Sequence, residues 1–142
     1  FLAASLLDLL DGLLARTTGR ATAFGAFLDS TLDRVSEGAM FAAIAYVFAI
    51  EGRAVDAAAV VLALLFSQLV SYARARAEGL GLECRIGAVT RPERVVLLAA
   101  GLMTGLAAPA VWLLAAASAA TVAQRMIHTA RQLERGPDSA PR

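Results

Sequence analysis

The stretch "DLLDGLLARTTGRATAFGAFLDSTLD", residues 8–33, places four aspartates in the first quarter of an otherwise apolar chain. The chain has 142 residues, of which 58% are hydrophobic and 18% are charged, whereas soluble domains carry about 25% charged residues. Ionised carboxylates are costly to bury and repel one another at close range. The four aspartates therefore need a partner of opposite charge, and the sequence around them must bring that partner close. They are Asp8, Asp11, Asp29 and Asp33.

The apolar runs predict an all-α fold, a polytopic bundle of transmembrane helices, because one span needs about 20 mostly apolar residues. We expect helices over residues 1–16, 23–50, 55–78 and 92 to about 106, and a last helix that opens at Pro109. The glycine-rich segment 79–92 is predicted to be a loop. Residues 1–135 then form one transmembrane domain, and 136–142 a disordered tail. The chain begins with Phe inside an apolar run, so we expect N-terminal sequence to be missing.

The basic residues support the membrane interpretation. All thirteen are arginine. If the spans alternate, one side of the membrane receives only Arg53. The other side receives Arg16, Arg20, Arg74, Arg76, Arg85, Arg91, Arg94, Arg125, Arg131 and Arg135. This bias is typical of membrane proteins and predicts that the arginine-rich side is cytoplasmic. A soluble helix bundle offers no reason for it.

The spacing of the aspartates aligns them on two helices. Asp8 and Asp11 are three residues apart, and Gly25, Asp29 and Asp33 are four apart, so each set shares one helix face. If the two faces meet, four carboxylates converge near the cytoplasmic end of a helix pair. Single aspartates often cap helices or form surface ion pairs, but two aligned sets favour a metal site.

Hard divalent cations such as Mg²⁺ bind carboxylate oxygens and keep positions open for substrate phosphates. Two such ions would balance four carboxylates and could still bind a diphosphate. Gly12 and Gly25 lie beside the aspartates, where a larger side chain would fill the space that a nucleotide needs.

The full series is Asp8, two residues, Asp11-Gly12, two residues, Ala15-Arg16, eight residues, Gly25, three residues, Asp29, three residues, Asp33. It resembles, at all eight positions, the signature of the CDP-alcohol phosphotransferases. The resemblance implies a fold of six transmembrane helices behind an amphipathic N-terminal helix, of which this chain would hold five. It also implies displacement of CMP from a CDP-linked lipid by an alcohol, which makes a new phosphodiester.

The same resemblance implies roles for individual residues. Two divalent ions, Mg²⁺ or Mn²⁺, would be held by Asp8, Asp11, Asp29 and Asp33. Asp33 would also be the catalytic base that takes the proton of the acceptor hydroxyl. The CDP moiety would be bound by Asp8, Gly12, Ala15, Arg16, Gly25 and Asp29.

A second stretch, "SYARARAEGLGLECRIGAVTRPERV" at residues 71–95, bears on the acceptor. Arg74, Arg91 and Arg94, together with Arg125 from the last helix, lie on the predicted cytoplasmic side. Arginine binds phosphate in a bidentate and geometrically specific way, which predicts an anion pocket. The alternative is that these arginines meet lipid headgroups.

This stretch is similar to the branch of the family that makes phosphatidylinositol phosphate and archaetidylinositol phosphate. The resemblance implies that the acceptor phosphate is bound by Ser71, Arg74, Arg91 and Arg125. Two positions depart from that branch: Arg74 stands in place of the usual lysine, and Ala23 in place of a basic residue. Glycerol 3-phosphate is therefore a second candidate acceptor beside inositol phosphate.

The expected partners are CDP-diacylglycerol, a phosphorylated alcohol, membrane lipids and a second copy of the chain, with no nucleic acid among them. We expect a prokaryotic cytoplasmic membrane with the active site facing the cytoplasm. Gly101 and Gly105 have the spacing of close helix packing or of a dimer interface. Two other classes are a transporter with intramembrane carboxylates and an inactive structural membrane protein. Transport acids tend to lie near the bilayer midplane on broken helices, whereas these aspartates gather at one end.

Overall fold

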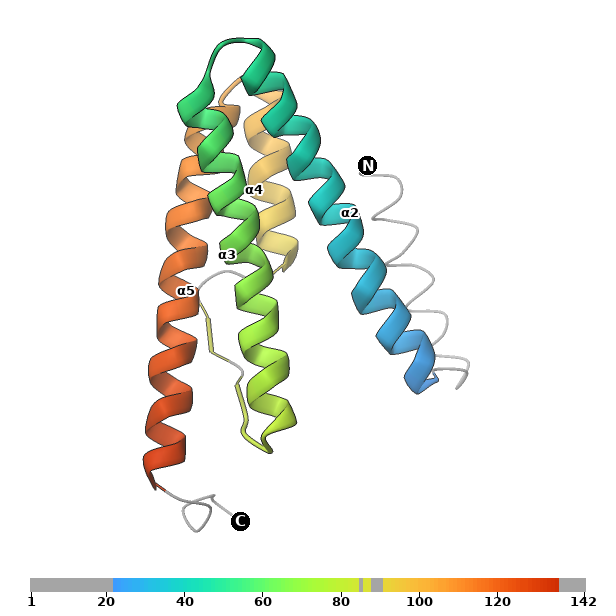
Figure 1. The fold of residues 1–142 in the computed structure, drawn as a ribbon, viewed down its shortest axis with the longest axis vertical. Helices are drawn as coiled ribbons and strands as arrows, with labels where there is room; N and C mark the ends of the chain where they lie inside the picture. The colour runs from blue at the N-terminus through green and yellow to red at the C-terminus, as the bar shows by residue number, and fades with distance from the viewer. Residues whose placement is uncertain (1–21, 85, 88–90, 136–142) are drawn as a thin grey trace. The chain divides into compact units, whose positions relative to one another are not determined.

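A computed structural model describes residues 22–84, 86–87 and 91–135 of the chain. Within these ranges the chain forms four α-helices and no strand, which confirms the predicted all-α fold (Figure 1). The helices are α2 (Ala23–Ile50), α3 (Ala54–Gly79), α4 (Arg91–Met103) and α5 (Ala107–Arg135). The predicted helix over 1–16 and the predicted tail 136–142 lie outside the described residues.

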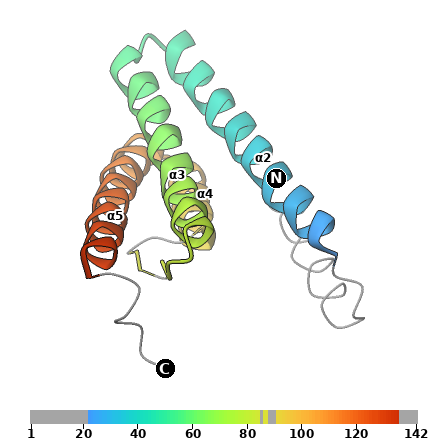
Figure 2. The same ribbon diagram turned by 60° about the horizontal axis from the view of Figure 1, so that its bottom comes forward.

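The chain divides into two compact units, residues 1–36 and 37–142, and α2 begins in the first unit and ends in the second. In the second unit α5 packs against both α3 and α4. Figures 1 and 2 show α3 and α5 side by side along much of their length. Short turns join α2 to α3 and α4 to α5, as expected for antiparallel neighbours in a helix bundle.

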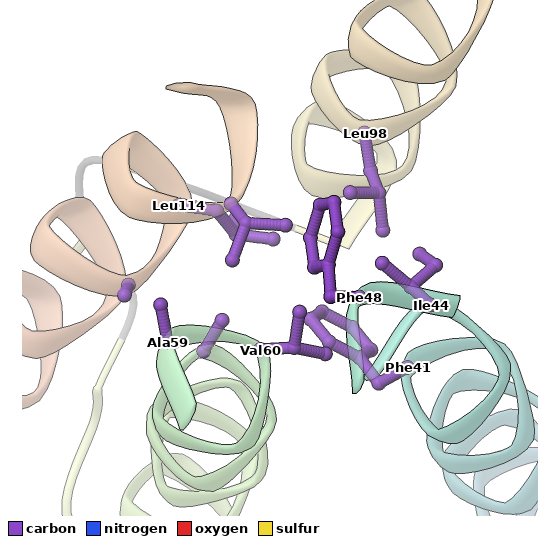
Figure 3. Packing of buried hydrophobic residues seen from close by; sticks show 10 residues of the cluster. Phe41, Ile44, Phe48, Ala59, Val60, Leu98 and Leu114 are labelled. Atoms are coloured by element: carbon purple, nitrogen blue, oxygen red, sulfur yellow. The ribbon is translucent and has the colours of Figure 1, made fainter. Parts of the chain in front are cut away.

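The core of the second unit forms where α2 meets the other three helices (Figure 3). Phe41, Ile44 and Phe48 recur every three or four residues, so they line one stripe of α2. This stripe packs against Val60 of α3 and Leu98 of α4. The core also contains Ala59, Ala63, Val111, Leu114 and Ala115. The several alanines let the helix backbones approach closely, as is typical of membrane bundles.

Two described helices, α3 and α5, are long and apolar enough to cross a membrane. They also present large apolar side chains outward, including Val61, Leu65 and Leu113, as a lipid-facing surface requires. The other two described helices, α2 and α4, do not meet this requirement of length and apolar composition. The first half of α2 carries Asp29 and other charged residues. With 13 residues, α4 is only about 20 Å long.

The turn between α4 and α5 corrects one predicted boundary. The helix expected to reach about Leu106 ends at Met103. Gly105 has a φ of 74°, a left-handed conformation that cannot continue a right-handed helix. Gly105 is therefore a turn residue rather than part of a helix-packing pair. The last helix begins at Ala107, so Pro109 lies inside its first turn.

Gly101, by contrast, lies in a close approach between α4 and α5. A Cβ at this position would overlap the Cβ of Ala110 and come 3.2 Å from the carbonyl oxygen of Leu106. The sequence predicted either close helix packing or a dimer interface for this glycine. At Gly101 the structure shows close helix packing.

We expect Gly101→Val to lower the free energy of unfolding by about 1–3 kcal/mol, because overpacking forces the two helices apart. Gly38→Ala is the matched control: nothing lies within 4 Å of a Cβ there, so the change should be neutral or stabilise α2 by up to about 1 kcal/mol. Thermal unfolding in detergent measures both. Equal effects of the two substitutions would contradict the close approach at Gly101.

The turn between α2 and α3 is held by one arginine. Arg53 lies 4.4 Å over the ring of Phe48 and its Nε donates to Asp56 at 2.9 Å. The indole Nε1 of Trp112 donates to the other oxygen of Asp56 at 3.1 Å. These contacts connect the beginning of α3 to the beginning of α5, at the ends of these helices remote from Ser71 and Arg125.

Candidate functional site

The structure describes α2, the helix that carries Asp29 and Asp33, from its first turn onward. Asp8, Asp11, Gly12, Ala15 and Arg16 lie outside the described residues. Gly25, Asp29 and Asp33 lie on α2 four residues apart, so they share one face as predicted. Asp29 is exposed and makes no hydrogen bond or ion pair to another described residue; Asp33 is half-buried. The carboxylates of Asp29 and Asp33 give α2 the hard oxygen donors that a divalent cation binds. Asp29 forms no ion pair with a described arginine.

Gly25 also has a local structural role that the sequence did not suggest. Thr22 directly precedes α2, and its hydroxyl oxygen accepts a hydrogen bond from the backbone N–H of Gly25 at 2.9 Å, which is the geometry of a helix N-cap. A Cβ at Gly25 would come 3.1 Å from that same oxygen. The absence of a side chain therefore lets the cap approach, in addition to any space that it leaves for a ligand.

A second group of predicted residues lies near the C-terminal end of α3. Arg74 donates from Nε to Glu78 at 2.8 Å, one turn along the helix, and both side chains are about half exposed. Ser71 is half-buried, and its hydroxyl lies 3.5 Å from the carbonyl oxygen of Ser67. Arg91 begins α4, but its side chain is outside what the structure describes. Arg74 is thus the predicted phosphate ligand that is most open to solvent among those described.

Arg125 has a different environment from Arg74. Its side chain is 7% exposed, Nε donates to the carbonyl oxygen of Ile86 at 2.9 Å, and Nη1 donates to that of Val70. Arg125 therefore connects α5 both to α3 and to the segment between α3 and α4. These two bonds use two of the five N–H donors of the guanidinium.

Described residues between α3 and α4 contact α5. Gln132 donates to the carbonyl oxygen of Glu83 at 3.0 Å, and Cys84 is 1% exposed. Gly87 has a φ of 148°, and a Cβ there would come 2.8 Å from the methyl group of Thr121. Only glycine fits this position comfortably. The sequence predicted a loop here, but not that side chains of α5 would hold its main chain.

One further pair of charged residues is buried at the helix interface and was not predicted. Glu37 of α2 is 6% exposed and Arg94 of α4 is 3% exposed. Arg94 Nε donates to Glu37 Oε1 at 3.3 Å, and Nη2 lies 3.3 Å from the same oxygen. A signal was present in the sequence: Glu37 follows Asp33 by four residues and so continues the series Gly25, Asp29, Asp33.

These features define a helical membrane protein in which α2 carries carboxylates on one face and α3, α4 and α5 carry arginines. A family model described as CDP-alcohol phosphatidyltransferase matches residues 1–124. The chain belongs to this family, and it is an integral membrane protein.

Two curated relatives illustrate the similarity. The chain is 42% identical, over 86% of its length and 59% of the relative's, to a phosphatidylinositol phosphate synthase of Mycobacteroides abscessus. It is also 42% identical, over 93% of its length and 68% of the relative's, to an archaetidylinositol phosphate synthase of Methanothermobacter thermautotrophicus. The chain thus spans about three fifths of the length of the first of these relatives.

Solved structures of Mycobacterium tuberculosis phosphatidylinositol phosphate synthase are also similar to this chain. The structure with CDP-DAG bound matches with a TM-score of 0.83 and 35% identity, over 97% of this chain and 72% of that chain. The structure in complex with manganese and citrate has a TM-score of 0.83 and 36% identity, over 97% of this chain and 69% of that chain.

Proposed function

We propose that this protein transfers a phosphatidyl group from CDP-diacylglycerol to a hydroxyl of inositol phosphate and releases CMP. The observation that carries the proposal is the aspartate series, whose described members share one face of α2. The similarity to phosphatidylinositol phosphate synthases along nearly the whole chain supports inositol phosphate as the acceptor. Glycerol 3-phosphate is the second candidate, because an arginine pocket suits either phosphate.

In this proposal Asp8, Asp11, Asp29 and Asp33 hold two divalent cations, Mg²⁺ or Mn²⁺. The solved relative in complex with manganese supports a divalent cation. When bound, such ions neutralise the diphosphate and stabilise the leaving nucleotide. Gly12, Ala15 and Gly25 leave room for the cytidine nucleotide, and Arg16 contacts its phosphates.

Asp33 is the proposed general base. It takes the proton of the acceptor hydroxyl, and the hydroxyl oxygen bonds to the phosphorus of the phosphatidyl group. The bond from that phosphorus to the bridging oxygen of CMP breaks, and CMP leaves with the electron pair. Ser71, Arg74, Arg91 and Arg125 bind the phosphate of the acceptor and orient its hydroxyl, as bidentate arginine–phosphate contacts allow.

We further propose that the active site faces the cytoplasm of a prokaryotic cell and that the protein is a homodimer. The arginines of the α3–α4 segment and of the end of α5 support this orientation, since Arg53 alone lies in the turn at the other end of α3.

The acceptor is tested by CMP release from CDP-diacylglycerol and Mg²⁺ with the protein in detergent. Inositol phosphate, glycerol 3-phosphate and free inositol are compared at equal concentration. We expect inositol phosphate to give the highest kcat/KM and free inositol to give a rate near background. A higher kcat/KM with glycerol 3-phosphate would replace inositol phosphate by the second candidate, and equal rates with free inositol would contradict the phosphate pocket.

A further inference from the structure

We propose that His128 and Gln132 of α5 form a pH-sensitive switch that holds the chain after α3 while the His128 ring is neutral and releases it when the ring is protonated. Gln132 Nε2 donates to the main-chain carbonyl oxygen of Glu83 at 3.0 Å, and the same nitrogen lies 2.7 Å from His128 Nε2. All three residues belong to the same compact unit. The inference does not rest on the proposed function.

The carbonyl group of Glu83 determines which way the amide of Gln132 points. A carbonyl oxygen accepts hydrogen bonds and cannot donate them, so the amide presents its NH2 group there. If the amide were turned around, two acceptor oxygens would face each other. With the NH2 group in this position, His128 Nε2 has to accept the second hydrogen bond. Such an acceptor exists only on a neutral ring that carries its proton on Nδ1.

Protonation of His128 removes this acceptor. Nε2 then carries a hydrogen, and two donors face each other. Rotation of the Gln132 amide resolves the conflict, because its Oε1 accepts from the charged ring in a stronger, charge-assisted hydrogen bond. The spacing of four residues on one helix keeps the two side chains within reach. The rotated amide turns its oxygen toward the carbonyl oxygen of Glu83, so the hydrogen bond between α5 and Glu83 is lost.

The attachments on either side of Glu83 do not depend on His128. At the end of α3, Gly81 has a φ of 78° and Leu82 N–H donates back to the carbonyl oxygen of Ala77 at 3.0 Å, which is the hydrogen bond of a Schellman helix end. Further along, Arg125 donates to the carbonyl oxygen of Ile86, and a guanidinium group stays charged in proteins. The release is therefore confined to the chain around Glu83 and Cys84.

The identity of the titrating group follows from composition. Histidine is the residue type that ordinarily changes charge between about pH 5 and 8, and His128 is the only histidine in the chain. Carboxylate and guanidinium groups ordinarily titrate outside this range. Those on the described elements around His128 are Glu83, the ion-paired Arg74 and Glu78 and also Arg76 on α3, Arg91, Glu93 and Arg94 at the beginning of α4, and Arg125, Arg131 and Glu134 on α5.

Cys84 provides a reporter of the switch, because it directly follows Glu83, is 1% exposed and is the only cysteine in the chain. The probe is the thiol reagent 4,4′-dithiodipyridine, applied to the protein in detergent. At each pH the rate of modification is divided by the rate for the unfolded protein, which removes the pH dependence of the thiol chemistry itself.

We expect this ratio to rise about fivefold when the pH falls from about 7.5 to about 5.5, the change that loss of one ordinary hydrogen bond gives. A ratio that stays constant would overturn the inference. It would mean that the charged ring rotates away and leaves the hydrogen bond from Gln132 to Glu83 intact.

Three variants assign the response to these two side chains. His128→Gln still offers an acceptor oxygen but does not titrate, so the ratio should stay low at both pH values. Gln132→Leu removes the hydrogen bond to Glu83 and should give the high ratio at both. Gln124→Leu is the same substitution at an exposed position of α5 and should respond as the parent does. A rise in His128→Gln equal to that of the parent would overturn the inference, as would a Gln132→Leu protein that behaves like the parent.

A second measurement needs the parent protein alone. Long-range nitrogen–proton NMR of the single histidine distinguishes the two neutral forms of the ring. We expect the proton on Nδ1 at about pH 7.5, and a proton on Nε2 of the neutral ring would contradict the inference, since Nε2 could not then accept from Gln132. These measurements do not require CMP release, so the failure of the switch and the failure of the proposed function are distinguishable.

Discussion

Asp33→Asn is expected to lower kcat for CMP release by about 1,000-fold or more, with the fold intact. The substitution removes the proposed proton acceptor, and general-base catalysis contributes roughly 100- to 10,000-fold. It also removes one carboxylate from the proposed metal site, which should weaken the stabilisation of the leaving nucleotide. Asparagine has nearly the same shape as aspartate, so the substitution should leave the helix bundle folded.

The matched control for Asp33→Asn is Asp56→Asn. Asp56 accepts hydrogen bonds from Arg53 and Trp112 at the remote end of α3, so its loss should lower stability modestly and leave kcat of the folded protein unchanged. Equal activity of Asp33→Asn and the parent at saturating Mg²⁺ would remove Asp33 from the mechanism.

Arg125→Met is expected to have the second largest effect, and it should change both stability and the acceptor KM. Arg125 makes two hydrogen bonds from a buried charged group, each of which contributes about 1.5 kcal/mol or more. We therefore expect the free energy of unfolding to fall by about 3 kcal/mol. If the same guanidinium binds the acceptor phosphate, KM for inositol phosphate should also rise at least tenfold.

Arg131→Met on the exposed face of α5 is the control for Arg125→Met, and it should change neither quantity. Denaturation and steady-state kinetics on the two variants separate the two roles of Arg125. Lower stability with an unchanged KM would mean that Arg125 only holds the segment between α3 and α4. A higher KM with unchanged stability would contradict the hydrogen bonds to Val70 and Ile86.

Much of the fold was predictable from local sequence signals. The apolar run that ends at Ile50 and the turn "EGRA" after it predicted the bounds of α2, and the bounds of α3 were predicted to within one residue. The end of α4 was missed, because the left-handed Gly105 stops the helix inside an otherwise apolar run. A glycine in such a run does not by itself reveal whether it packs a helix or ends one.

The contacts that build the candidate site were less predictable, because they join residues far apart in the chain. The pair Glu37–Arg94 spans 57 residues, and the contact of Arg125 with Ile86 spans 39. The sequence placed both arginines near a site but could not assign Arg125 to main-chain carbonyls or Arg94 to a buried carboxylate. Only the packing of the four helices determines which polar groups face these two arginines.

The most direct test of the account is mass spectrometry of the lipid product from CDP-diacylglycerol, inositol phosphate and Mg²⁺. The account predicts phosphatidylinositol phosphate and CMP in a one-to-one ratio, both abolished by removal of the divalent cation. CMP without that lipid product, or an undiminished yield after removal of the cation, would contradict a metal-dependent transfer to inositol phosphate.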